Sequence, residues 1–142
     1  MDDREQVVRH LEITQGVINR LANNSFLIKG WSMAILAAAI LFIARSNSIY
    51  SEYLILIFLI LILIFGFWLL DGYFLWQERL FRGIYDDVRQ QEETDFKMNI
   101  PAQLKKANNK WINSVCSLTL RIFYGVEIVF IVTVFFVLRG VK

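Results

Sequence analysis

The sequence predicts an all-α fold in which three long helices form a transmembrane helical bundle with cytoplasmic helical extensions. Hydrophobic residues make up 56% of the 142 residues, whereas soluble domains usually hold roughly 45–50%. Charged residues still make up 20%, but they are absent or rare in three long apolar stretches. This segregation along the chain is typical of a multi-pass membrane protein, and we expect residues 1–142 to form a single domain.

The first predicted span covers residues 26–45. Lys29 and Trp31 lie near its start. We expect both to be interface anchors, because Lys and Trp side chains reach the lipid headgroups from such positions. Small residues recur at every fourth position of this span and predict a face that another helix can approach closely. These residues are Gly30, Ala34 and Ala38.

The second and third spans are predicted at residues 53–75 and 117–138. Residues 53–70 hold no charge and suit a hydrocarbon core about 30 Å thick. The third span is apolar except for Arg121 and Glu127. The short connection between the first two spans predicts an antiparallel hairpin.

The distribution of Lys and Arg beside the spans predicts the orientation of the chain. Eleven lie before the first span, at its start or between the second and third spans, and three lie on the opposite side. Because positive residues stay in the cytoplasm, we expect a cytoplasmic N-terminus and an external C-terminus in a bacterial inner membrane. Residues 1–25 contain no continuous apolar stretch of the kind found in a cleavable signal peptide.

The segments 1–25 and 76–116 are predicted to be the cytoplasmic helical part. Apolar residues recur there at helical spacing. We expect the second helix to continue to about Glu93 and to be followed by a turn. A third helix is expected to begin near Pro101, with Asn99 as a cap, and to run unbroken to Leu138.

Glu127 lies about ten residues into the third span, roughly 15 Å along a helix and near the bilayer middle. A carboxyl group at that depth needs a partner, a cavity or a second subunit, or it stays protonated. The functional interpretation is a pore, a proton site or a polar contact between subunits. The structural alternative is a protonated side chain that joins two helices by a hydrogen bond.

Asp71 and Arg121 are each expected near the cytoplasmic end of a span. Because these two spans are antiparallel, the two side chains can lie at the same depth. We therefore expect an inter-helix ion pair that fixes the register of the second and third helices, rather than a catalytic pair.

Asparagines precede the first and third spans in pairs spaced four residues apart, so each pair shares a helix face. Facing amide rows would line a hydrated vestibule or bond neighbouring subunits. The alternative is an ordinary solvated helix surface. The two pairs are Asn19 with Asn23 and Asn109 with Asn113.

Several enzyme classes are disfavoured. One cysteine and one histidine cannot form a multi-cysteine zinc site or a histidine-rich metal centre. The patterns GxxxxGK[ST], HExxH and GxSxG are absent. Arg4 and His10 resemble the Arg–His motif of HEPN ribonucleases, but the chain leaves no room for that larger helical domain. We expect no catalytic residues, cofactor or metal.

Two stretches, NNSFLIKGWSMAILAA at residues 23–38 and FWLLDGYFLWQERLFRGIYDDV at residues 67–88, resemble a family of small, mostly uncharacterised bacterial membrane proteins. Its pattern has an NSFxxKGW start and an LDxYxLxQERLFRxLY-like second segment, from which Gly72 and Phe74 depart. The architecture is also similar to accessory membrane proteins of type VI-B CRISPR systems and other phage-defence membrane effectors. The matching residues are Ser25, Lys29, Gly30, Trp31, Asp71, Glu78, Arg79 and Arg82.

The resemblance and the spans together lead us to expect a homo-oligomeric pore or membrane-perturbing effector in phage defence. Three spans cannot enclose a conducting path within one chain, whereas a ring of subunits can. One alternative is a membrane scaffold that binds a cytoplasmic protein partner through residues 77–91. Another is a small transporter subunit with Glu127 as its proton site. A net charge of +2 gives no reason to expect direct nucleic-acid binding.

Overall fold

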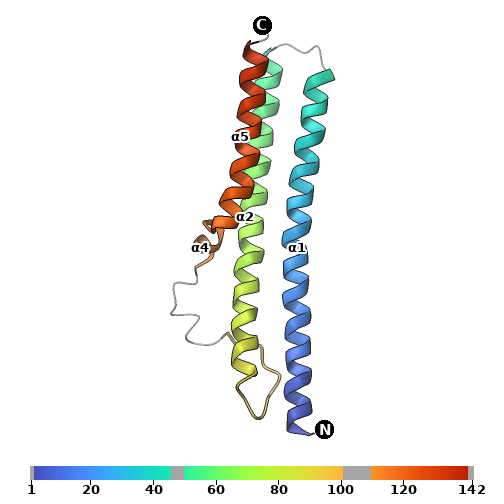
Figure 1. Ribbon diagram of the computed structural model, residues 1–142, viewed down its shortest axis with the longest axis vertical. Coiled ribbons are helices and arrows are strands. Elements are labelled where there is room, and N and C mark those ends of the chain that lie inside the picture. The colour runs from blue at the N-terminus through green and yellow to red at the C-terminus, as the bar shows by residue number, and fades with distance from the viewer. Residues whose placement is uncertain (1, 46–49, 101–109, 141–142) are drawn as a thin grey trace.

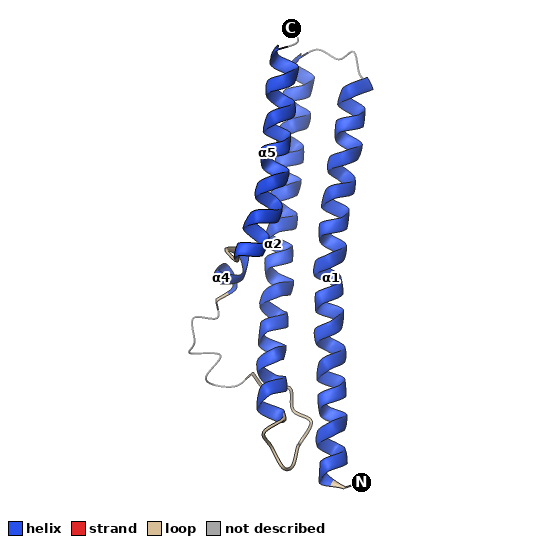
Figure 2. Ribbon diagram, in the orientation of Figure 1, coloured by secondary structure: helices blue, strands red, loops and turns tan. Residues whose placement is uncertain are grey.

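The computed structural model describes residues 2–45, 50–100 and 110–140 of the chain (Figure 1). Over these ranges the chain is mostly helical and contains no strand (Figure 2), which confirms the predicted all-α class. The helices are, in chain order, α1 (Asp3–Arg45), α2 (Tyr50–Val88), α4 (Trp111–Val115) and α5 (Leu118–Gly140).

Three of these helices, α1, α2 and α5, are long and apolar enough to cross a bilayer. With 43 and 39 residues, α1 and α2 are each roughly 60–65 Å long and exceed a hydrocarbon core of about 30 Å. In contrast, α5 has 23 residues and spans about 35 Å. It lies beside the N-terminal half of α2, whereas α1 and α2 run side by side over their full length (Figure 1).

The interior consists of two apolar clusters at different heights of the bundle. The smaller cluster joins the N-terminal end of α1 to the C-terminal end of α2 through Val7, Ile84 and Val88. The larger cluster fills the membrane half, where close van der Waals packing rather than exclusion of water holds helices together. Its buried members are Leu36, Ile43, Tyr53, Ile57, Ile60, Ile64, Leu120, Tyr124 and Ile131.

The expectation of one unbroken third helix is wrong. The helix is interrupted at Cys116–Ser117, between α4 and α5. The Trp68 indole N–H donates to the Val115 carbonyl at 2.9 Å and thereby satisfies a carbonyl at the end of α4. Val115 also packs so closely on Gly72 that a Cβ there would lie 2.9 Å from the Val115 Cα. Contacts with α2 therefore set the break.

The second helix ends at Val88, a turn earlier than the expected end near Glu93. The following loop returns to α1 and includes Phe96, whose φ of 58° lies in the left-handed region. The expected start of the third helix at Pro101 lies outside the described residues.

Candidate functional site

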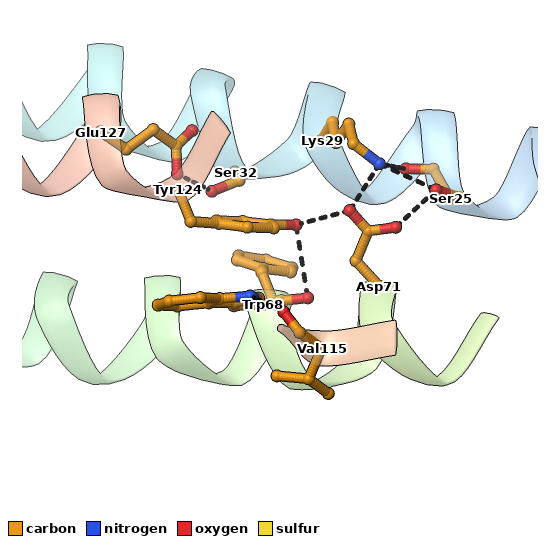
Figure 3. A network of polar contacts seen from close by, with 9 residues as sticks. Ser25, Lys29, Ser32, Trp68, Asp71, Val115, Tyr124 and Glu127 are labelled. Carbon is orange, nitrogen blue, oxygen red and sulfur yellow. Dashed lines mark hydrogen bonds and ion pairs between the residues drawn. The ribbon is translucent and has the colours of Figure 1, made fainter. Parts of the chain in front are cut away.

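A fully buried carboxylate, Asp71 on α2, is the centre of a polar network that joins the three long helices (Figure 3). Two residues of α1 contact it. The Lys29 ammonium nitrogen lies 2.5 Å from Asp71 Oδ2, and the Ser25 hydroxyl donates to Oδ1 at 2.5 Å. Because Ser25 and Lys29 are four residues apart, they share one face of α1, and Lys29 also donates to Ser25 Oγ at 2.8 Å.

Tyr124 brings α5 into the same network. Its hydroxyl donates to Asp71 Oδ2 at 3.1 Å. Its ring is fully buried and stacks on the Trp68 ring, with 5.9 Å between centroids. Because the Trp68 indole also bonds the end of α4, the Asp71 network is coupled to the break before α5.

The contacts among Ser25, Lys29 and Asp71 connect α1 to α2. A Ser–Lys pair acts as nucleophile and base only when the amine is neutral, whereas here a carboxylate holds the ammonium in an ion pair. The carboxylate is in turn satisfied by a cation and two hydroxyl donors. Such a completed network suits the fixing of helix positions.

Glu127 forms a second, incomplete polar contact on the opposite side of Tyr124 (Figure 3). Its side chain is 5% exposed, and its Oε2 accepts a hydrogen bond of 2.7 Å from Ser32 on α1. The other oxygen, Oε1, is buried and has no hydrogen-bond partner in the part of the chain that the structure describes. A carboxyl oxygen left unpaired at membrane depth is costly, and such residues commonly mark ligand or ion sites.

A groove of about 720 Å³ runs between α1 and α5 beside Glu127. The two helices contribute equally to its walls, and Glu127 is the only charged residue among them. The lining residues are Met33, Leu36, Ala37, Ile40 and Leu41 of α1 and Ile122, Phe123, Val126, Glu127 and Phe130 of α5.

The expected ion pair between Asp71 and Arg121 does not form. Asp71 faces α1 and pairs with Lys29, whereas Arg121 is exposed on α5 and makes no ion pair with any described residue. The same geometry corrects the anchor role of Lys29, because its side chain is directed into the bundle and is only 21% exposed. Trp31 does lie on the outer surface of α1, 64% exposed.

The described asparagines of the two expected pairs do not face one another within the chain. Asn19 and Asn23 are exposed on α1, and Asn19 accepts a hydrogen bond of 3.0 Å from Gln15. Asn113 lies on α4, which packs on the side of α2 away from α1 (Figure 1). Asn109 lies outside the described residues.

A buried histidine on α1 contacts the loop after α2. His10 is 1% exposed, and its Nδ1 shares a hydrogen bond of 2.6 Å with Thr94 Oγ1. Its ring also lies 5.5 Å from the Phe96 ring. Its position in the sequence indicates that it is buried, because Val7, His10 and Thr14 recur at helical spacing on one buried face of α1. These contacts hold the loop after α2 against the N-terminal part of α1.

The contacts of Ser25, Ser32 and Tyr124 could not be predicted from the sequence, because isolated hydroxyls in an apolar span do not reveal their partners. In the loop after α2, the Lys97 side chain donates to Asp95 and lowers the pKa of that carboxyl, while Asp95 raises the pKa of Lys97.

Among the described residues, no group of three or more His, Cys, Asp and Glu side chains is placed to hold a metal.

The fold and the network define a multi-pass helical membrane protein. The chain matches no protein-family model, no curated protein and no solved structure. The family resemblance of residues 23–38 and 67–88 therefore stays an expectation.

Proposed function

We propose that the protein is a homo-oligomer of a bacterial inner membrane whose subunits associate along α1 and together form a pore or perturb the bilayer. One observation carries this proposal: the small-residue face of α1 is uncovered. Gly30, Ala34 and Ala38 are all exposed, and a Cβ added to Gly30 would meet no described atom within 4 Å. The protomer packs other faces of α1 against α2 and α5.

A small-residue face supports helix association in lipid because it lets two backbones approach closely. Helical spacing extends the same face of α1 toward its N-terminus through the exposed Asn19 and Asn23. A contact along this face would therefore combine close packing in the membrane with an amide row at the cytoplasmic mouth. This supports a ring of subunits with a polar entrance.

The pore follows from the same arrangement. Three spans cannot enclose a conducting path within one chain, and Lys29 and Asp71 are paired with each other inside the protomer. A path between subunits would have Asn19 and Asn23 at its cytoplasmic end. The excess of Lys and Arg on that side supports a cytoplasmic N-terminus.

Mass measurement of the full chain in detergent and in nanodiscs tests the assembly. We expect a discrete oligomer that Ala34→Leu shifts to smaller species, because the larger side chain separates the helices. Val129→Leu is the matched control, since Val129 is exposed on α5 away from this face. A monodisperse wild-type monomer would refute the proposal.

Ion flux in liposomes tests the pore separately. We expect flux with the wild-type chain and with Val129→Leu, and loss of flux with Ala34→Leu. An intact oligomer without flux would refute the pore and leave the assembly standing.

A further inference from the structure

We propose that the groove between α1 and α5 is a binding site for a lipid-soluble amine, which enters from the bilayer as the neutral free base, takes the proton of the Glu127 carboxyl group and then donates a hydrogen bond to the resulting carboxylate. This inference concerns a ligand of the protomer and rests on different residues from the proposed assembly.

The walls of the groove suit an apolar ligand body. Apart from Glu127, every lining residue is aliphatic, aromatic or methionine. A volume of about 720 Å³ falls in the range of roughly 300–1,000 Å³ that is usual for small-molecule sites. Met33, Leu41 and Val126 line the groove and are more than half exposed. Since this part of the chain lies at membrane depth, the groove opens to lipid.

Glu127 supplies the polar group that such a site needs. Ser32 occupies only Oε2, so Oε1 keeps its full capacity to accept a hydrogen bond. The terminal torsion of a glutamate is soft. A small rotation of the carboxylate can therefore turn Oε1 into the groove and toward an N–H donor.

The carboxyl group of Glu127 selects a basic ligand over a neutral donor, because proton transfer to an amine forms an ion pair inside the groove. Lys29 lies 6.0 Å from the centroid of the Phe123 ring in the groove wall, and it is already paired with Asp71. Among the described residues Glu127 is the single acidic group of the groove and has no ion-pair partner, so the ammonium group of a bound amine would be its counter-ion. The rings of Phe123 and Phe130 in the wall add favourable cation–π contacts.

Three probes of similar shape separate the contributions to binding. They are 1-naphthylmethylamine, its N,N,N-trimethylammonium analogue and the neutral 1-naphthalenemethanol. Binding of each probe to the full chain in nanodiscs is measured by calorimetry, with empty nanodiscs subtracted. We expect saturable binding of the amine, at least tenfold weaker binding of the trimethylammonium compound, which lacks an N–H donor, and the weakest binding of the alcohol.

Two variants test the site itself. Glu127→Gln removes the charge with little change of shape, and we expect at least a tenfold loss of amine affinity. Ala37→Phe fills the groove from α1 while the carboxylate stays in place, and we expect loss of binding there too. Val129→Phe, on the surface of α5 outside the groove, is the control and should bind as the wild type does.

Several results would overturn the proposal. One is the absence of saturable amine binding; another is binding that survives Ala37→Phe in a folded chain. Equal binding of the amine and the alcohol would show a site for neutral lipid-like molecules. Efficient cross-linking between Ala37→Cys of one copy and Ile122→Cys of another, in a Cys116→Ser background, would show that a second copy fills the groove.

Discussion

The Lys29 ammonium nitrogen lies 2.5 Å from Asp71 Oδ2 and joins α1 to α2 at a carboxylate that is fully buried. Tyr124 of α5 donates to the same oxygen. The three long helices are therefore positioned against one charged group rather than by apolar packing alone. Because lipid offers no water to a separated charge, each partner depends on the others.

Removal of one member of this ion pair should be strongly destabilising. Asp71→Asn leaves Lys29 without its counter-charge, and breaking a buried pair commonly costs about 3–5 kcal/mol. We expect the lower end of that range, since Lys29 is partly exposed. Unfolding by SDS titration measures the loss. The double variant Lys29→Met with Asp71→Asn should lose less than the sum of the single variants, and strict additivity would contradict the coupling.

Arg121 should contribute little to the stability of the protomer. Its side chain is exposed on α5, so Arg121→Gln is expected to change the free energy of unfolding by no more than about 0.5 kcal/mol. A charge exchange, Asp71→Arg with Arg121→Asp, should be as unstable as Asp71→Arg alone. Recovery of stability in the exchanged chain would show that these two residues do interact.

The sequence predicts the three long apolar helices because hydropathy reports directly on each segment. It also indicates that Asp71 and Glu127 are unusual, since charge at membrane depth is costly. It cannot identify their partners, because several positions on a neighbouring helix lie at similar depth. Depth along the spans predicts Arg121 as the partner of Asp71. The partner is Lys29 instead, because the Asp71 side chain points from α2 toward α1.

A methyl group at Gly72 should destabilise the protein. A Cβ there would lie 2.9 Å from the Val115 Cα, so Gly72→Ala must displace α4. Overpacking of this kind typically costs about 1–3 kcal/mol. Gly66→Ala is the matched control on the same helix, because a Cβ at Gly66 meets no described atom within 4 Å. Helix propensity alone should leave that variant neutral or stabilise it by up to about 1 kcal/mol. Equal stability of the two variants in SDS titration would contradict the close approach.

The loop after α2 should show a pH dependence centred on Asp95. Its pKa is lowered below the ordinary value of 3.8 by the Lys97 side chain, then by the Lys97 backbone N–H. The contact therefore stabilises the loop at pH values above the ordinary pKa and is lost as the pH falls through the lowered one. Carbon-13 NMR titration should give a higher Asp95 pKa in Lys97→Met and an unchanged one in Lys110→Met. An unchanged pKa in Lys97→Met would show that the pair does not form in solution.

Loss of His10 should free the same loop from α1. Its Nδ1 shares a hydrogen bond with Thr94, and its ring contacts Phe96. His10→Ala removes both of these contacts between α1 and the loop. We expect faster hydrogen–deuterium exchange over residues 90–97, measured by mass spectrometry.

His10→Phe keeps an aromatic ring but loses the bond to Thr94, and its exchange should be intermediate. Arg9→Ala, at an exposed neighbouring position, should leave the loop unchanged. If His10→Ala exchanged no faster than Arg9→Ala, the loop would be held by its other contacts, and the apolar cluster of Val7, Ile84 and Val88 would then be the main connection at this end of the bundle.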